Sequence, residues 1–383
     1  MYRLTEEQQR IVREAAAVAD TSVAPHAARV DSEGAFPRES IAALGAAGLL
    51  GVTVPPAFGG SGQGFRTMAA VLDETAQRCA STAMVYLMHL CGVACYAAAS
   101  GKAGPYLQKA ARGEHLSTLA FSERGSRSHF WAPVSRAVSA NGNVRLSADK
   151  AFVTSAGQAD GYVVSTLAAD GKQPMESTIY LVLRDDAGIS VSGAWSGLGM
   201  RGNSSAPMTL DKVSVGGNRA LTAPGKGLDM MLGVVLPAFQ VGTASIALGI
   251  AEASVRATTR HLTTARLEHL NSSLAELPAL RARLAQMRVE TDRARAHLVS
   301  VLDSLEAPGP MTQLLVLEAK AAATEAAVTV TELGMRTCGG AAFGGAHGLE
   351  RMYRDARAPI VMSPTTDQAY DFIGRALCGM DLF

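Results

Sequence analysis

The sequence predicts an α+β multidomain fold in which a small antiparallel β domain lies between two helical domains. Its 383 residues are 48% hydrophobic and 18% charged, which is enough apolar material for two or three packed units. Apolar residues recur with helical spacing near both ends of the chain, whereas the middle has the patterns of β-strands. We therefore expect an N-terminal helical domain over residues 1–115, a middle antiparallel β domain over 116–220, and a C-terminal domain resembling a four-helix bundle over 221–383.

Helix signals fill the N-terminal domain. Thr5 and Gln8 have the spacing of a capping box before an Ala-rich pattern, which predicts a first helix. A second helix is expected over residues 38–50, and the segment 52–56, Val-Thr-Val-Pro-Pro, is expected to be extended. After a glycine-rich loop, two longer helices are expected over residues 65–79 and 81–99.

Runs of β-forming residues between turn signals fill the middle domain and predict its strands. The expected strands cover residues 134–138, 143–146, 161–167, 177–183 and 208–215. Short strands joined by turns indicate a small antiparallel β domain.

Long helical patterns return in the C-terminal domain. Residues 280–305 place Leu284, Leu298 and further apolar residues on one side of a helix, and residues 311–335 form another helical stretch. The stretch 232–250 carries no charge, but it contains proline and several glycines. We interpret it as a buried helix rather than a membrane span, and we expect no membrane partner.

Charge and cysteine usage argue against several classes of protein. The net charge is +1, from 35 Lys and Arg against 34 Asp and Glu, whereas a nucleic-acid binder needs concentrated positive charge. The five dispersed cysteines, without a Cys-x-x-Cys, give no support for a disulfide scaffold or a cysteine zinc site, and they favour a cytoplasmic protein. The eight histidines form no cluster in the sequence, so we expect no metal site. The polar residues 1–8 predict no signal peptide.

The sequence also lacks the short motifs of several enzyme classes. It has no Gly-x-Gly-x-x-Gly after a strand, no Walker pattern, no Gly-x-Ser-x-Gly and no His-Glu-x-x-His. Nothing therefore supports a Rossmann, P-loop, serine-hydrolase or zinc-peptidase function. His89 lies on an apolar helical stretch, and we interpret it as a buried histidine with satisfied hydrogen bonds rather than a ligand.

Five local segments, taken in order and at their spacing, carry more information than any one of them. They are Gly-Val-Thr-Val-Pro-Pro-Ala-Phe-Gly-Gly within residues 46–65, Ser-Glu-Arg-Gly-Ser-Arg-Ser at 122–128, Lys-Ala-Phe-Val-Thr-Ser at 150–155, Gly-Leu-Gly-Met-Arg-Gly at 197–202, and Gly-Gly followed by Arg-Asp-Ala-Arg within 338–357. In this order they resemble the acyl-CoA dehydrogenase family, from about residue 5 to about residue 380. The helical, β, helical order agrees with the fold of that family.

The resemblance implies a non-covalent FAD cofactor between the β domain and the C-terminal helices. By this resemblance, Phe152 stacks near the flavin ring and Thr154 reaches the N5 side of the ring. An aromatic ring and a hydroxyl donor suit a flat, electron-poor ring system. Ser122 matches a family threonine at the other edge of the flavin, and Ser128 matches a family serine beside the pyrophosphate.

The adenine end of FAD is held partly by the partner subunit in this family. The resemblance therefore implies cofactor roles for Arg266 and Arg336, although Arg336 fits a solvated arginine at a helix end equally well. Thr365 matches a family threonine near the cofactor. We expect a homodimer or homotetramer, because the apolar sides of helices over residues 284–302 and 321–330 exceed what a lone bundle should expose.

The usual catalytic glutamate of the family is missing. In register with the Arg-Asp-Ala-Arg segment, Ser363 occupies its position and Pro364 follows; a second family location of the base falls on Phe239, beside Gln240. A serine hydroxyl is a poor base without an activating partner, but Ser363 still has a backbone N–H, the group that by this resemblance donates to the thioester oxygen. Other candidates for a displaced base are Glu123, His129 and Asp367. Of these, we interpret Glu123 as a structural residue.

Three functions remain open on these residues. The first is an FAD-dependent dehydrogenase of an acyl thioester, acyl-CoA or acyl carrier protein, with hydride transfer to flavin N5 and a non-standard base. The second is a reduced-flavin monooxygenase on the same fold, which needs no α-proton base. The third is a non-catalytic subunit, disfavoured because the flavin-facing segment 152–154 and Ser128 look intact. The residues identify neither the acyl group nor the electron acceptor.

Overall fold

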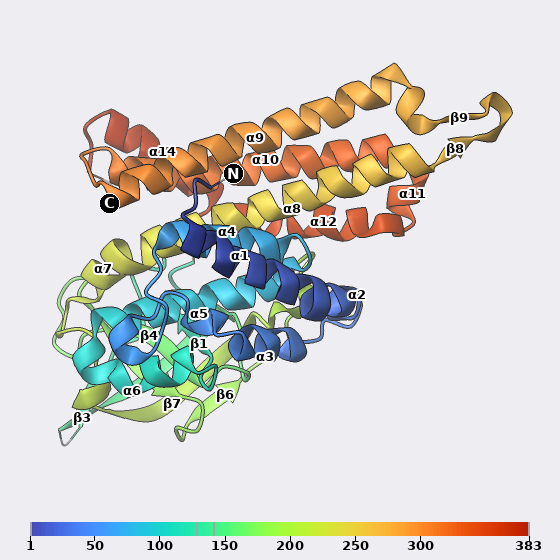
Figure 1. Cartoon of the computed structure of the whole chain (residues 1–383). Coiled ribbons are helices and arrows are strands. Elements are labelled where there is room, and N and C mark those ends of the chain that lie inside the picture. The colour runs from blue at the N-terminus through green and yellow to red at the C-terminus, as the bar shows by residue number, and fades with distance from the viewer. Residues whose placement is uncertain (1, 128, 141, 382–383) are drawn as a thin grey trace.

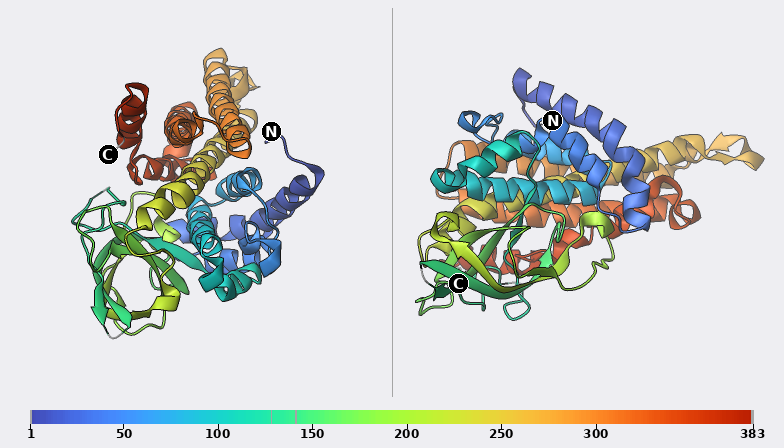
Figure 2. Two further views of the ribbon diagram at one scale, coloured as in Figure 1. Left: turned by 90° about the vertical axis from the view of Figure 1, so that its left-hand side faces the viewer. Right: turned by 90° about the horizontal axis from the view of Figure 1, so that it is seen from below.

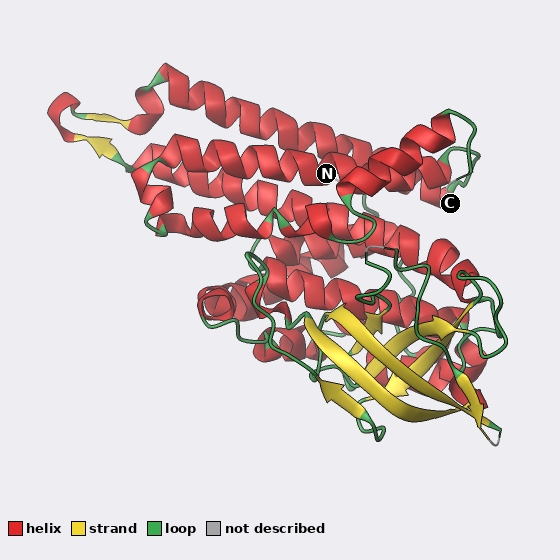
Figure 3. Cartoon of the chain, turned by 180° about the vertical axis from the view of Figure 1, so that it is seen from behind, coloured by secondary structure: helices red, strands yellow, loops and turns green. Residues whose placement is uncertain are grey.

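The computed structural model describes residues 2–127, 129–140 and 142–381. The C-terminal helices form one long layer, and the N-terminal helices and the β domain pack side by side beneath it (Figures 1 and 2). Figure 3 shows the strands of the β domain gathered at one side of the molecule. The order of the elements along the chain confirms the predicted α+β fold, in which a β domain follows one helical domain and precedes another.

The N-terminal helical domain contains helices of 6 to 19 residues. They are α1 (Glu6–Val18), α2 (Ala27–Ser32), α3 (Arg38–Ala46), α4 (Phe65–Ala76), α5 (Ala80–Ala98) and α6 (Ser100–Ala111). The predicted capping box is present, because the Thr5 side chain accepts a hydrogen bond from Gln8 N and the Gln8 side chain accepts one from Thr5 N. Buried α5 is the centre of this domain and contains His89, which is hydrogen-bonded to Leu50 O and Ser117 N, as predicted.

The expectation of an extended segment at residues 52–56 is wrong. The chain turns there and enters a short 3-10 helix, Pro56–Phe58. Gly62 N donates to Val54 O at 2.8 Å and Gln63 N to Val52 O at 2.9 Å, so the glycine-rich loop folds back on this segment. A Cβ on Gly60 would lie 2.2 Å from Val54 O, so this close approach requires glycine.

The β domain consists of two facing sheets, with strand orders β1-β4-β5 and β2-β3-β7-β6. The strands are β1 (Ser117–Ala120), β2 (Val138–Ala140), β3 (Asn143–Val153), β4 (Gly161–Leu167), β5 (Ser177–Leu183), β6 (Ile189–Val191) and β7 (Ala206–Gly216). The β1–β4 pair is parallel and the other pairs are antiparallel. Side chains alternate along β4: Tyr162 and Val164 face the core between the sheets, and Val163 faces the main helical core.

One predicted strand of this domain begins too early. The pattern predicts a strand at residues 134–138, but β2 covers only Val138–Ala140. The backbone N–H groups of Val134 and Ser135 donate to the Glu123 carboxylate, at 2.8 and 2.9 Å. A side chain therefore satisfies the donors that a sheet would otherwise use.

The C-terminal domain contains three long helices and several short ones. The elements are α7 (Gly227–Met230), α8 (Leu236–Thr264), the hairpin β8 (Arg266–Leu267) and β9 (Ser272–Ser273), α9 (Pro278–Glu306), α10 (Thr312–Cys338), α11 (Gly340–Phe343), α12 (Leu349–Asp355), α13 (Ala358–Val361) and α14 (Thr366–Leu377). The helices over Ala80–Ala98 and Gly227–Thr264 are long and apolar enough to cross a membrane, but 89% and 78% of their most apolar windows are buried inside the fold. Such burial is typical of core helices, as interpreted for residues 232–250.

The predicted apolar faces of α9 and α10 are not exposed. On α9, Met287, Leu298 and Leu302 are buried against α8 and α10, and most of the Ala-rich run of α10 is also buried. Because these faces form the core of the bundle within one chain, they give no argument for an oligomer.

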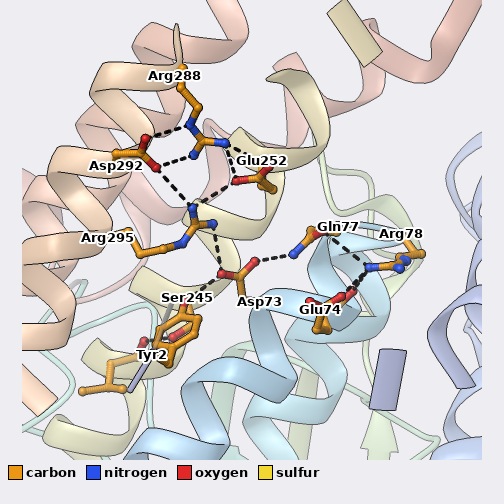
Figure 4. A network of polar contacts seen from close by, with 11 residues as sticks. Tyr2, Asp73, Glu74, Gln77, Arg78, Ser245, Glu252, Arg288, Asp292 and Arg295 are labelled. Atoms are coloured by element: carbon orange, nitrogen blue, oxygen red, sulfur yellow. Dashed lines mark hydrogen bonds and ion pairs between the residues drawn. The ribbon is translucent and has the colours of Figure 1, made fainter. Parts of the chain in front are cut away.

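A buried charge network ties the N-terminal helices to the C-terminal layer (Figure 4). Asp73 on α4 accepts from the Arg295 guanidinium on α9 at 3.1 Å and from Tyr2 OH at 2.7 Å. Arg295 also contacts Glu252 on α8 at 3.0 Å, and Glu252 pairs with Arg288 at 2.9 Å. We refer to Asp73, Glu252, Arg288 and Arg295 as the charged junction.

Candidate functional site

A pocket of about 320 Å³ lies where the three domains meet. Met84 and Met88 of α5 contribute one part of its wall, and Phe239 of α8 lies on the wall as well. The β domain contributes residues of β3 and of the loop before β7, and the loop after α13 completes the lining. A pocket built from three domains and lined mainly by apolar side chains is a candidate ligand site.

Phe152 is presented to this pocket by an irregularity in β3. The pairing of β3 with β7 shifts register between Lys150 and Val153, and Phe152 has a φ of 55°. A bulge of this kind re-aims a side chain, and a left-handed phenylalanine is uncommon. The ring is 70% exposed and faces Trp195 edge-on at 6.4 Å. A large exposed aromatic ring held in an unfavourable backbone conformation points to a ligand that covers it.

Hydroxyl and amide groups lie on the β-domain wall of the pocket. Thr154 Oγ1 lies 2.9 Å from Ser205 Oγ, and both residues line the pocket together with Ser122 and Asn203. Ser122 O accepts from Ala151 N at 2.9 Å, which places Ser122 beside the bulged segment. These groups can donate hydrogen bonds to a ligand without adding a net charge.

A buried ion pair supports this wall from behind. Lys150 Nζ contacts Glu123 Oε1 and Ser165 O, each at 2.6 Å, and Glu123 also accepts from Val134 N, Ser135 N and the Ser135 hydroxyl. Burial alone would raise the pKa of the Glu123 carboxyl, but the Lys150 ammonium and these hydrogen bonds outweigh burial and hold that pKa below its usual value. The carboxylate is therefore fully engaged in fixing the segment that carries Ser122.

The loop after α13 brings Ser363 to the pocket, between Met362 and Pro364, which also line it. Lys320 of α10 donates from Nζ to the backbone oxygens of Met362, at 2.5 Å, and Pro364. Burial lowers the pKa of Lys320 to about 7. Thr365 caps α14 through a capping box with Gln368, so its hydroxyl has a structural role.

Four residues singled out from the sequence come together at this pocket: Ser122, Phe152, Thr154 and Ser363. Ser128 lies outside the described residues. The remaining three, Arg266, Arg336 and Thr365, are not among the lining residues. Helices α8 and α10 both end at the end of the bundle from which the β8–β9 hairpin projects (Figure 1). Arg266 is the first residue of β8, and Arg336 lies in the last turn of α10. Arg266 donates to Asn271 within the hairpin, and Arg336 is exposed.

The candidate bases for proton abstraction are not at the pocket. Glu123, His129 and Asp367 are not among its described lining residues, and Gln240 is buried elsewhere in α8. Within the described lining, the single ionisable side chain is that of Arg127. The described pocket therefore offers neutral donors and one cation, and no carboxylate.

Family models match almost the whole chain. The model described as acyl-CoA dehydrogenase, N-terminal domain matches residues 5–114, the middle-domain model matches 118–213, and the C-terminal-domain model matches 225–378. The chain belongs to the acyl-CoA dehydrogenase family. It is thus an FAD-dependent oxidoreductase of the type that acts on acyl thioesters.

Individual relatives of this acyl-CoA dehydrogenase family member are distant but cover its full length. The chain is 26% identical over 382 residues to a probable acyl-CoA dehydrogenase of Bacillus subtilis named YngJ, covering 98% of this chain and 99% of the relative. The structure of butyryl-CoA dehydrogenase from Megasphaera elsdenii superposes with a TM-score of 0.91 at 21% identity, covering 98% and 99% of the two chains. The prolyl acyl carrier protein oxidase AnaB superposes with a TM-score of 0.86 at 20% identity, covering 98% and 99%.

FAD is the cofactor of this family, and the pocket residues fit its flavin ring. Phe152 offers an open aromatic face, and Thr154, Ser122 and Ser205 offer hydroxyls for the polar edge of the ring. When bound, the flavin supplies the two-electron acceptor that the described side chains lack.

Sequence reasoning missed three features of the site. Trp195 and Arg127 line the pocket, and Lys320 supports it from α10. Arg127 lies inside the segment at 122–128, and Trp195 lies two residues before the start of the segment at 197–202, so both are in or near segments that the sequence analysis singled out. Lys320 stands alone in an Ala-rich run, where nothing in the sequence distinguishes a buried lysine from an exposed one.

Proposed function

We propose that this protein oxidises an acyl thioester, carried by coenzyme A or by an acyl carrier protein, to its α,β-unsaturated form. The observation that carries the proposal is the presence of Ser363 on the same apolar pocket as Phe152 and Thr154. The name of the acyl carrier protein oxidase among the structural neighbours is the reason for keeping both thioester carriers.

Each pocket residue has a role in this proposal. Phe152 and Thr154 would hold the flavin ring, which would supply the hydride acceptor for this oxidation. The backbone N–H of Ser363 donates to the thioester carbonyl, which stabilises negative charge that develops on the oxygen. Met84, Met88 and Phe239 pack against the acyl group and exclude water from it.

The base in this reaction is non-standard. The α proton passes to a displaced base outside the described lining, such as a basic group of the substrate, and the loss of a positioned side-chain base lowers the rate by roughly 10²–10⁴-fold. The Ser363 hydroxyl lacks the basicity to take the proton unaided at neutral pH.

Anaerobic mixing of the FAD-loaded protein with a panel of acyl thioesters tests the proposal. We expect loss of the visible flavin absorbance with at least one coenzyme A or carrier-protein thioester, together with formation of the unsaturated product. If every thioester in a panel of short, branched, cyclic and aminoacyl groups leaves the flavin oxidised, the proposal fails.

The second candidate is a reduced-flavin monooxygenase, which the absence of a carboxylate from the described lining also favours. In that case the reduced protein plus oxygen hydroxylates a substrate, while acyl thioesters never reduce the oxidised protein. The two experiments together separate the candidates.

We also propose that the protein is a homodimer or homotetramer whose FAD sites are shared between subunits. Arg266 and Arg336 do not line the pocket of their own chain, and Phe343 and Leu377 expose 86% and 69% of their surface. Light scattering of the eluting protein tests this, and a monomer with a full complement of FAD contradicts it.

A further inference from the structure

Lys320 is a buried cation at the back of the pocket loop. Its side chain is among the largest in the protein that are fully buried, and its Nζ donates to the carbonyl oxygens of Met362 and Pro364. These two residues flank Ser363 on either side, and all three line the pocket. One ammonium group therefore holds the backbone at both sides of Ser363.

The surroundings of Lys320 differ from those of the other fully buried lysine. Lys150 has the Glu123 carboxylate at 2.6 Å, whereas no carboxylate of the described residues forms a salt bridge with Lys320. A buried ammonium is strongly disfavoured unless it is paired and hydrogen-bonded, and an apolar side chain of similar size is often neutral or better for stability. Stability alone therefore does not explain a lysine at this position.

We propose that Lys320 is a positioning residue, which fixes the place of Ser363 at the pocket by holding the Met362 and Pro364 carbonyls. This inference rests on the proposed function, in which Ser363 meets the thioester at this pocket. The reason is geometric, because a displacement of about 1 Å at a reacting centre lowers rates by roughly 10²-fold.

The variant Lys320→Met in the full-length, FAD-loaded protein tests the inference. Methionine keeps the length and volume of the side chain and removes the donors. We expect flavin reduction by an acyl thioester to slow about ten- to hundredfold, with FAD content and melting temperature close to wild type. A merely structural lysine would instead lower the melting temperature along with the activity.

A matched control and a second readout separate the explanations. Lys102 also donates to a backbone carbonyl, Ala220 O at 2.6 Å, but is exposed and away from the pocket, so Lys102→Met should change neither rate nor stability. Hydrogen exchange of the amides at residues 361–366 reports on the loop without any turnover. We expect faster exchange there in Lys320→Met and no change in Lys102→Met.

The outcomes decide the inference even if the reaction is assigned wrongly. If no thioester reduces the wild-type flavin, the proposed function fails. The exchange measurement still decides the inference: unchanged exchange at 361–366 in Lys320→Met rejects a loop held by Lys320, and faster exchange supports it. Wild-type rate and wild-type exchange in Lys320→Met overturn the inference. If Lys320→Met does not fold, Lys320→Gln, which keeps a neutral donor, replaces it with the same two readouts and the same criteria.

Discussion

The charged junction and the pocket use polar groups in opposite ways. In the junction, Arg295 is 3% exposed and contacts Asp73 at 3.1 Å and Glu252 at 3.0 Å, so charge is paired with charge (Figure 4). In the described lining of the pocket, the polar side chains are hydroxyls, the Asn203 amide, the Trp195 indole and the single cation Arg127. Both regions join the N-terminal helices to the C-terminal layer, but they do so with different kinds of polar group.

The difference indicates that the structural role and the chemical role belong to different regions of the fold. A buried ion pair fixes the geometry of its elements strongly, but only while both partners are present. Neutral donors at a reaction centre can stabilise developing charge without pairing with it beforehand, and their dipoles are already oriented. The junction thus fixes the positions of α4, α8 and α9 relative to one another. The pocket instead has neutral hydrogen-bond donors on its β-domain wall.

Removing one partner from the junction should have the largest effect. Arg295→Met leaves Asp73 and Glu252 buried without their shared cation, which should lower the free energy of unfolding by about 3–5 kcal/mol. The measurement is urea and thermal unfolding of the FAD-loaded protein. The control Arg293→Met removes an exposed pair with Glu290 on the same helix and should change stability by less than about 1 kcal/mol. Equal effects of the two variants would contradict the distinction between the regions.

Asp355 is a buried carboxylate next to the pocket, and its stability effect should depend on pH. This buried carboxylate accepts from the backbone N–H of Met200, a pocket residue, at 2.6 Å, and burial raises its pKa to about 6. A raised carboxyl pKa favours the protonated form in the folded state, so this contribution to stability is complete below about pH 4 and is lost as pH rises through about 6. At pH 7, above the raised pKa of about 6, the loss amounts to about 3 kcal/mol.

Asp355→Asn should therefore be more stable than wild type at pH 7, by up to about 3 kcal/mol, provided that the amide oxygen keeps the Met200 hydrogen bond. The stability difference between the two proteins should shrink toward pH 4. Unfolding curves at several pH values measure this difference in stability. A difference that does not depend on pH would show that the pKa of the Asp355 carboxyl is not raised.

Much of the fold could be predicted from the sequence because the patterns agree with the final packing. The strands at 161–167 and 177–183 were predicted to the residue, because each is an apolar run between turn signals. The segment at 52–56 has the same β-forming residues, but a glycine loop folds onto it and supplies its hydrogen-bond donors. Periodicity cannot reveal such a partner.

The site was predicted in part, for related reasons. The family resemblance singled out Ser122, Phe152, Thr154 and Ser363, and the structure brings these four to one pocket. It does not bring Arg266 or Arg336 there, because the first begins the β8–β9 hairpin and the second lies in the last turn of α10. Arg295 and Lys320 look like any other charged residue in the sequence, because only tertiary packing decides which cations are buried.

Phe152→Ala should affect the pocket without weakening the fold. The ring is 70% exposed, so its removal should change the free energy of unfolding of the FAD-free protein by less than about 0.5 kcal/mol. Loss of stacking on the flavin should weaken FAD binding about tenfold, which corresponds to about 1.4 kcal/mol. Fluorescence titration with FAD measures the affinity, with Val138→Ala as the control at another exposed site of the β domain. Unchanged affinity would mean that Phe152 does not contact the flavin.

Ser363→Glu places a carboxylate in a pocket whose described lining has none. A well-aimed general base is worth about 10²–10⁴-fold, but Pro364 restricts the backbone conformation of residue 363, so the new carboxylate should be misaimed. We therefore expect less than about a tenfold gain in the rate of flavin reduction by simple acyl thioesters. Stopped-flow absorbance measures it, and a gain above about 10²-fold would show that the loop already has the geometry for a carboxylate base.

Ser363→Ala should have the smallest effect of all. If residue 363 contributes its backbone N–H, the hydroxyl is dispensable, and the rate of flavin reduction should stay within about threefold of wild type. Alanine keeps the N–H and leaves the Met362 and Pro364 carbonyls free to accept from Lys320. If the hydroxyl instead relays the α proton, the same substitution should slow reduction by about 10²-fold or more. The pocket would then resemble the charged junction, because the rate of flavin reduction would depend on the single Ser363 side chain as stability depends on Arg295.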